Sequence, residues 1–303
     1  MKPILSEVSG LLLLNKAPHI SSNHALQQVK RLFQAKKAGH TGTLDPLATG
    51  LLPICFGEAT KFSQYLLNAN KTYLATLQFG EATTTGDREG AVIARSCTAF
   101  QAEELLAASQ KLLGWIEQIP PMFSAIKHKG LPLYQYALKG IPVPREKRKV
   151  YIQTIELIQF SFPEVVLKIT CSKGTYIRTL AEDLAQSLGS VAHLSALSRI
   201  QSDQFTLEKA YSFSQLEKLS ATERAHLLFP VDYLVKHLDS VVLNLEDETK
   251  IKTGRPVQFY ANYAKMTPLS LYTIDDRFVG LGVYVPDLQV IRALRLLRTN
   301  KDT

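Results

Sequence analysis

The sequence predicts an α+β fold, divided into a large domain and a small C-terminal β domain. The chain has 303 residues, more than one hydrophobic core usually organises, and 46% of them are hydrophobic against 20% charged. Two strand-like runs, 150–160 and 165–171, follow each other directly, without the helix that a βαβ unit would place between them. After residue 240 only short strand-like runs remain, which is typical of a separate β domain.

The N-terminal part of the chain predicts a strand, a helix and a loop. Residues 10–14 are almost uniformly apolar, as in a buried strand. Apolar residues then recur at helical spacing over 25–33, with Ser21 or Ser22 available as the N-cap and Gly39 as the stop signal. A loop is therefore expected from Gly39 onward.

The middle of the chain alternates between strands and helices. Tyr73 begins a strand whose apolar residues alternate as far as Phe79. Thr98 and Gln101 match a capping box ahead of a helix that ends near Gly114. These elements place Tyr73 at the edge of a half-buried strand.

A long basic loop and a second helix complete the large domain. The loop covers 130–150 and closes with Arg145-Glu-Lys-Arg-Lys149, and a helix over 179–188 follows the two strands. Beyond them, the predicted short strands are 241–245, 257–260, 269–274 and 279–285. We place the domain boundary so that the large domain is 1–240 and the small one 241–303.

The charge of the chain favours a polyanionic partner. Lys and Arg number 35 against 27 Asp and Glu, which gives a net charge of +8. A basic surface that is merely solvated is the alternative. Three scattered cysteines without a CxxC pair argue against a zinc site or disulfide framework. No apolar run is long enough for a signal peptide or a membrane span, so we predict a cytoplasmic protein without a membrane partner.

The stretch GHTGTLDPLATGLLP, residues 39–53, concentrates glycines, a histidine and an aspartate in one loop. On pattern alone, Asp45 followed by Pro46 is typical of a helix start, with the aspartate as N-cap. The stretch also resembles the signature loop of the TruB family of tRNA pseudouridine-55 synthases. Similar family blocks follow in family order and together cover most of residues 10–205: 10–33, 57–73, 119–140 and 171–185.

The resemblance implies a pseudouridine synthase fold with a mixed, largely antiparallel central sheet flanked by helices. It implies an enzyme that isomerises uridine 55 in the T-loop of tRNA to pseudouridine, with Asp45 as the catalytic carboxylate. Tyr73 is then expected to stack on the uracil, Tyr176 and Arg178 to complete the pocket, and Leu197 to close it. Arg178 would keep Asp45 ionised through a forked contact, against the desolvation that favours the neutral acid.

The isomerisation moves uracil from an N-glycosidic to a C-glycosidic bond. It needs a carboxylate that acts as nucleophile or base, but neither a metal nor a cofactor, so we expect none. The sequence leaves open whether Asp45 attacks the sugar, attacks the base, or removes a sugar proton to give a glycal.

Further family positions predict contacts with the RNA. His40 is the candidate wedge that fills the space of the extruded nucleotide, with a backbone-bonded turn histidine as the alternative. Lys16, Lys61 and Arg199 match basic positions near the site and are expected to contact phosphates. For the run 145–149, a solvated loop and an RNA contact are both open. The tRNA T-stem-loop is the expected partner.

Residues 241–303 resemble the small PUA-like β-barrel domain of bacterial family members, through KTGRPV at 252–257 and the run of short strands, and the resemblance implies that this domain binds RNA. The chain also departs from the family pattern at four positions: Asn15, Ala17, His19 and Ser198. Two other functions compete with the stand-alone tRNA enzyme, which we expect to be a monomer without an obligatory protein partner. One is a guide-RNA-dependent synthase, which the absence of long basic extensions disfavours; the other is an RNA chaperone, which could coexist with catalysis.

Overall fold

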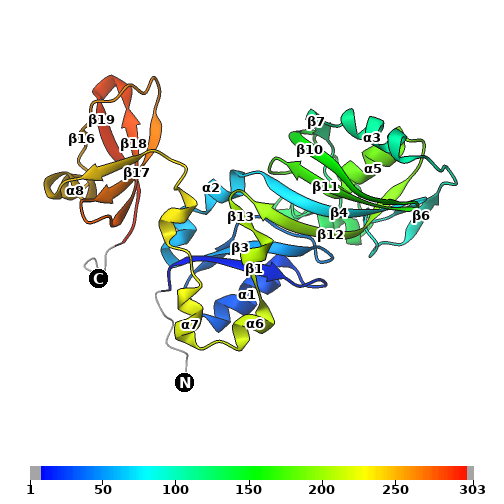
Figure 1. Ribbon diagram of the computed structural model, residues 1–303, viewed down its shortest axis with the longest axis horizontal. Coiled ribbons are helices and arrows are strands. Elements are labelled where there is room, and N and C mark those ends of the chain that lie inside the picture. The colour runs from blue at the N-terminus through cyan, green and yellow to red at the C-terminus, as the bar shows by residue number, and fades with distance from the viewer. Residues whose placement is uncertain (1–7, 299–303) are drawn as a thin grey trace.

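The computed structural model describes residues 8–298 and has one large sheet with helices against it and a smaller sheet at the C-terminus (Figure 1). Only the pairs β1–β14 and β3–β12 of the large sheet are parallel, so the predicted mixed, largely antiparallel sheet is confirmed. In spatial order its strands are β14 (Tyr211–Ser212), β1 (Gly10–Lys16), β3 (Thr49–Phe56), β12 (Ala192–Ser202), β4 (Lys71–Phe79), β11 (Glu164–Cys171), β10 (Arg148–Ser161) and β7 (Gly114–Gln118), with β2 (Ala38–His40) on β3 and β13 (Phe205–Thr206) on β12.

Helices and short turns cover this sheet and connect its strands. The helices of the large domain are α1 (Ser22–Leu32), α2 (Ser63–Asn68), α3 (Ala102–Gln110), α4 (Leu133–Leu138), α5 (Ile177–Ser187), α6 (Phe213–Glu217) and α7 (Ala221–His226). Two small hairpins, β5 (Glu81–Thr83) with β6 (Val92–Arg95) and β8 (Lys127–His128) with β9 (Leu131–Pro132), project from it. Three 3-10 turns are η1 (Gly57–Lys61), η2 (Leu207–Lys209) and η3 (Val231–Leu234).

The apolar run at the start of β1 is explained by burial on both faces. Leu12 and Leu14 pack in the main core with α1, whereas Leu11 and Leu13 face a second core that includes Leu234. A strand with one solvent-exposed face would alternate polar and apolar residues, but both faces of β1 are buried.

Two predicted helix boundaries are wrong. Helix α1 ends at Leu32, because Gln34 adopts the left-handed region with φ 50°, and Gly39 lies in strand β2 instead of stopping the helix. The capping pair of α3 is Gln101 with Glu104, whose carboxylate accepts the Gln101 N–H at 2.8 Å, so the cap is shifted three residues from the predicted Thr98.

The C-terminal sheet contains β15 (Ser240–Leu243), β17 (Thr267–Thr273), β18 (Phe278–Val285), β19 (Val290–Leu296) and β16 (Val257–Gln258), with a 3-10 turn η4 (Pro286–Leu288). Helix α8 (Leu245–Lys252) was not predicted; its N-cap is Asn244, whose Oδ1 accepts the N–H of Asp247 at 2.8 Å.

A polar clasp fixes the C-terminal sheet to the large domain. Glu58 in η1 accepts the Lys61 ammonium at 2.6 Å and the backbone N–H of Arg298 at 2.7 Å, while Lys61 donates to the Leu296 carbonyl at 2.9 Å. Beside the clasp, the ring of Phe62 lies 5.6 Å from that of Phe278. The two domains therefore meet through both polar and apolar contacts.

Candidate active site

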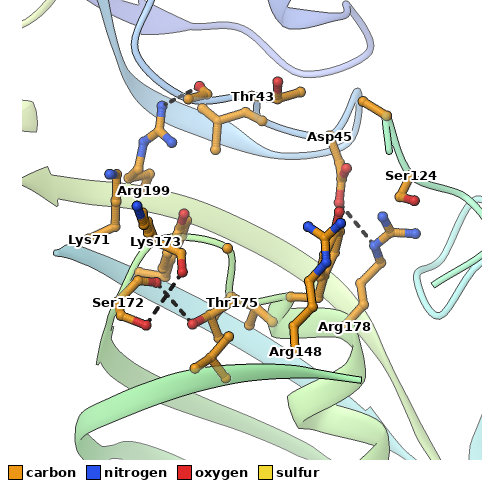
Figure 2. Close-up of a pocket in the computed structure, with 18 of the residues that line it drawn as sticks. Thr43, Asp45, Lys71, Ser124, Arg148, Ser172, Lys173, Thr175, Arg178 and Arg199 are labelled. Atoms are coloured by element: carbon orange, nitrogen blue, oxygen red, sulfur yellow. Dashed lines mark hydrogen bonds and ion pairs between the residues drawn. The ribbon is translucent and has the colours of Figure 1, made fainter. Parts of the chain in front are cut away.

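A cavity of about 630 Å³ lies between the loop after β2, the strands β4 and β12, and the start of α5. Figure 2 shows the side chains that surround it. The five residues predicted to form the pocket all line it, although they are spread over more than half of the chain: Asp45, Tyr73, Tyr176, Arg178 and Leu197. The fold thus brings the predicted site together.

Asp45 lies in a turn and not at a helix start. The Asp45 carbonyl accepts the N–H of Ala48 at 3.1 Å, and strand β3 begins at the next residue, Thr49. The helix-cap interpretation of Asp45 and Pro46 is therefore wrong. The same pair suits a β-turn, where Asp is favoured at the first position and Pro at the second.

Three buried side chains hold this turn in place through hydrogen bonds to its backbone. Ser22 at the start of α1 accepts the Leu44 N–H at 2.7 Å and donates to the Leu44 carbonyl at 2.9 Å. The Lys16 ammonium donates to the Pro46 carbonyl at 3.2 Å, and Arg199 donates to the Gly42 carbonyl at 3.2 Å. Backbone groups on both sides of Asp45 are thus fixed by side chains from β1, α1 and β12.

Arg178 forms an ion pair with Asp45, from Nε to Oδ2 at 2.9 Å. Its other two nitrogens donate to backbone carbonyls, Nη1 to Thr85 at 2.7 Å and Nη2 to Phe123 at 2.8 Å. The predicted contact is present, but the forked geometry is wrong because two of the three nitrogens serve other segments. Only 4% of the Arg178 surface is exposed, so the guanidinium is held rigidly on three sides.

A second carboxylate, Asp87, was missed from the sequence. It is buried, and one oxygen accepts the Thr85 hydroxyl at 2.6 Å and the Glu89 N–H at 3.1 Å. Its other oxygen lies 4.0 Å from Nη1 of Arg178. The polar turn around Thr85 was the available signal, since a turn rich in Thr, Gly and Asp is a common place for buried side-chain to backbone bonds.

Burial raises the pKa of Asp45, and the negative charge of Asp87 acts in the same direction. The positive charge and hydrogen bond of Arg178 oppose this rise and favour the carboxylate. The predicted opposition between desolvation and Arg178 is therefore confirmed in direction. It leaves a carboxylate whose proton affinity is higher than that of a solvated aspartate, as a base or nucleophile requires.

Two tyrosines line the cavity from different elements. Tyr73 in β4 is half-buried beside Arg199, and burial raises its pKa. Tyr176 immediately precedes α5, and its backbone is held at both polar groups by one buried side chain, Gln118. The Gln118 amide accepts the Tyr176 N–H at 3.0 Å and donates to the Tyr176 carbonyl at 3.3 Å. Sequence reasoning missed this clamp, because nothing local to Gln118 points to α5.

Two residues that were expected to contact phosphates, Lys16 and Arg199, are buried instead. Lys16 is 1% exposed and its ammonium donates to the carbonyls of Ala17, Ile20 and Pro46, so it has no surface for RNA. Arg199 is also 1% exposed, and it donates to the Leu51 carbonyl at 2.7 Å besides that of Gly42. Both cations instead support the Asp45 turn.

The remaining predicted RNA residues stay predictions. His40 lies half-buried in β2, where its Nδ1 is buried without a hydrogen-bond partner among residues 8–298. Burial, and then the charge of Arg199, lower its pKa, which favours the neutral ring. Lys61 keeps part of its surface but is engaged in the clasp with Glu58.

Comparisons with known proteins identify the family of this chain. Residues 30–177 match the model of the TruB family pseudouridylate synthase N-terminal domain, and residues 178–247 match that of the tRNA pseudouridylate synthase B C-terminal domain. The chain belongs to the TruB family of pseudouridine synthases. Tyr176 and Arg178 therefore lie where the two TruB models meet.

Curated TruB relatives match along nearly the whole chain. The tRNA pseudouridine synthase B of Neisseria meningitidis serogroup A is 48% identical over 298 residues, 98% of this chain and 97% of that protein. The protein of the same name from Thiobacillus denitrificans is 50% identical over 282 residues, 93% of this chain and 94% of that protein.

Solved structures confirm the pseudouridine synthase fold of this TruB member. The crystal structure of a Cbf5-Nop10-Gar1 complex matches with a TM-score of 0.70 at 22% identity, covering 96% of this chain and 84% of that chain. An H/ACA RNP bound to a substrate RNA containing 2'-deoxyuridine matches with a TM-score of 0.71 at 19% identity, covering 97% and 86%. At such identities the likeness concerns the fold alone.

Metal and membrane signals are absent from the described part of the chain. Within residues 8–298, no three His, Cys, Asp or Glu side chains are grouped to hold a metal ion. In the same range, no helix combines the length and apolar character needed to span a bilayer.

Proposed function

We propose that this protein converts uridine 55 in the T-loop of tRNA to pseudouridine, with Asp45 as its catalytic carboxylate. The observation that carries the proposal is the Asp45–Arg178 ion pair of 2.9 Å, in a cavity that Tyr73 also lines. The names of the curated relatives supply the tRNA substrate and the class of reaction.

The cavity supports this chemistry through its size and its lining. About 630 Å³ lies within the range of pockets that enclose small ligands, and the cavity is bounded by the Tyr73 ring and Leu197. A uracil removed from its stack would regain stacking on Tyr73, worth about 1–3 kcal/mol. Leu197 would exclude water from the broken glycosidic bond, while His40 would fill the space left in the RNA.

Asp45 supplies the group that the isomerisation requires. The C1'–N1 bond breaks, the uracil rotates, C1' bonds to C5, and the C5 proton is finally lost. A buried carboxylate next to Arg178 suits attack on the sugar, attack on the base, or removal of a sugar proton. No redox change occurs, so the chemistry calls for neither a metal nor an organic cofactor.

The test compares wild type with Asp45→Asn on an unmodified tRNA transcript, with pseudouridine mapped along the whole RNA. We expect product at uridine 55 from wild type only, with both proteins binding the transcript. A transcript carrying cytidine at position 55 is the control for site choice. Equal product from Asp45→Asn, or product at another uridine, contradicts the proposal.

The same assay separates the competing functions. The purified monomer without guide RNA should be sufficient, whereas a guide-dependent synthase would be inactive until a guide is added. A chaperone without chemistry would accelerate tRNA folding but leave every uridine unchanged.

A further inference from the structure

We propose that Arg148 binds a phosphodiester group adjacent to the target nucleotide, at the mouth of the catalytic cavity. This role rests on the proposed function, in which the substrate is tRNA. It assigns a task to one residue of the basic run 145–149, for which the sequence left an RNA contact and a solvated loop open.

The cations of this run differ in their partners. Arg145 donates to the Pro120 carbonyl at 2.9 Å, and Lys147 pairs with Glu117 at 3.4 Å. Lys149 lies opposite Glu117 in the β10–β7 ladder. Neither the Lys149 ammonium nor the Arg148 guanidinium makes a hydrogen bond or ion pair with any residue in 8–298, and of these two Arg148 lines both the catalytic cavity and a second cavity beside it.

The backbone directs Arg148 toward the cavity. It is the first residue of β10, where side chains alternate between the two faces, and Val150 on its own face is buried. Figure 2 shows the Arg148 side chain extending into the site on the side of Arg178. The positive charge of Arg148 lowers the pKa of Tyr176, although burial has the larger effect and raises that pKa overall.

Arg148 also lines a second cavity, of about 270 Å³. Arg148 and Ile126 both line the catalytic cavity as well, so they lie between the two cavities. The charged side chains around that space are Lys127, Arg145 and Arg148, against a single acid, Glu146. An excess of cations beside an unpaired guanidinium favours an anionic ligand, and a guanidinium fork matches two phosphate oxygens.

The ligand is a phosphate of the substrate because of where Arg148 lies. A nucleotide whose uracil enters between Tyr73 and Asp45 carries its flanking phosphates at the entrance of the cavity, where Arg148 is exposed. Arg178 and Arg199 cannot do this, because they are buried and donate to protein oxygens. A purely structural role would need partners that Arg148 lacks within the described chain.

The experiment uses a synthetic T-stem-loop in which single phosphates next to the target uridine are replaced, one at a time, by neutral methylphosphonates. Wild type, Arg148→Gln and a matched control, Lys111→Gln at the exposed end of α3, are compared by equilibrium binding and single-turnover kinetics. We expect Arg148→Gln to weaken binding about 10-fold. The slope of log K against log salt should fall by about 0.7–0.9.

The decisive result is a coupling between protein and RNA changes. Wild type and Lys111→Gln should lose affinity at one particular methylphosphonate, whereas Arg148→Gln should be indifferent to that substitution. Arg148→Lys should recover part of the affinity, and all variants should melt within about 2 °C of wild type. Equal sensitivity of Arg148→Gln and Lys111→Gln at every linkage would overturn the proposal. Absence of pseudouridine from wild type would instead defeat the proposed function.

Discussion

The cations of the catalytic cavity form two groups that the sequence does not distinguish. The inner group is buried and donates to protein oxygens: Lys71, Arg178 and Arg199, which line the cavity, and Lys16, which donates to the Pro46 carbonyl. The outer group, Arg148, Lys149 and Lys173, is exposed, and within residues 8–298 only Lys173 has a side-chain partner, the Asn68 amide oxygen at 2.8 Å. The contrast teaches that a basic residue near an RNA site is assigned by its hydrogen bonds and not by its charge. Inner cations shape the enzyme, whereas outer cations are available to the substrate.

Arg178→Met should have the largest effect of any change to these cations. It leaves Asp45 and Asp87 near each other without their shared cation, and two buried carbonyls without a donor. We expect a loss of about 4 kcal/mol in the free energy of unfolding. Single-turnover rates should fall at least about 100-fold, while tRNA affinity stays near that of wild type. Urea denaturation and quench-flow measurements check this, and a selective loss of affinity would contradict the inner assignment.

Lys16→Met should be the next most damaging change. Three backbone carbonyls would lose a charged donor, including that of Pro46 beside the catalytic aspartate. We expect about 3 kcal/mol less stability and a reduced kcat, with KM for tRNA nearly unchanged. Lys218→Met at the exposed end of α6 is the matched control and should behave as wild type. If Lys16→Met raised KM alone, Lys16 would belong to the outer group.

The pH dependence of the rate tests whether Arg178 sets the ionisation of Asp45. Activity needs ionised Asp45, so kcat should fall as the pH is lowered through its pKa, which burial raises above 3.8. Because the charge of Arg178 opposes that rise, the residual activity of Arg178→Met should show its acid limb at higher pH. A single-turnover pH series on both proteins measures the limb. An unmoved limb would mean that Arg178 does not set the ionisation of Asp45.

Lys173→Gln should have the smallest effect. Its ammonium is exposed at the rim and its partner is a neutral amide, so we expect tRNA binding to weaken about 3-fold. The loss should disappear at high salt, with stability and single-turnover rate unchanged. Binding isotherms at two salt concentrations test this, and a change in melting temperature would move Lys173 into the inner group.

Much of the fold and pocket could be predicted because the signals are local. The double-sided burial of β1, the alternation in β4 and the stretch around Asp45 each express their role within a few residues. Gln118, Asp87 and the true partners of Lys16 could not be found this way. Their roles depend on the sheet bringing β7 to α5 and the 83–90 turn to Arg178. A buried lysine that donates to three carbonyls has the same local sequence as one that contacts a phosphate.

The clasp of Glu58, Lys61 and Arg298 has a consequence for binding in two places at once. Together with the Phe62–Phe278 contact, it holds the C-terminal sheet against the large domain, so the span from the catalytic cavity to that sheet is set by the fold. An RNA that contacts both would form its second contact at a high effective concentration, without the entropy loss of ordering a hinge. An RNA whose two contact sites are spaced differently from that span would lose the advantage of binding both surfaces at once.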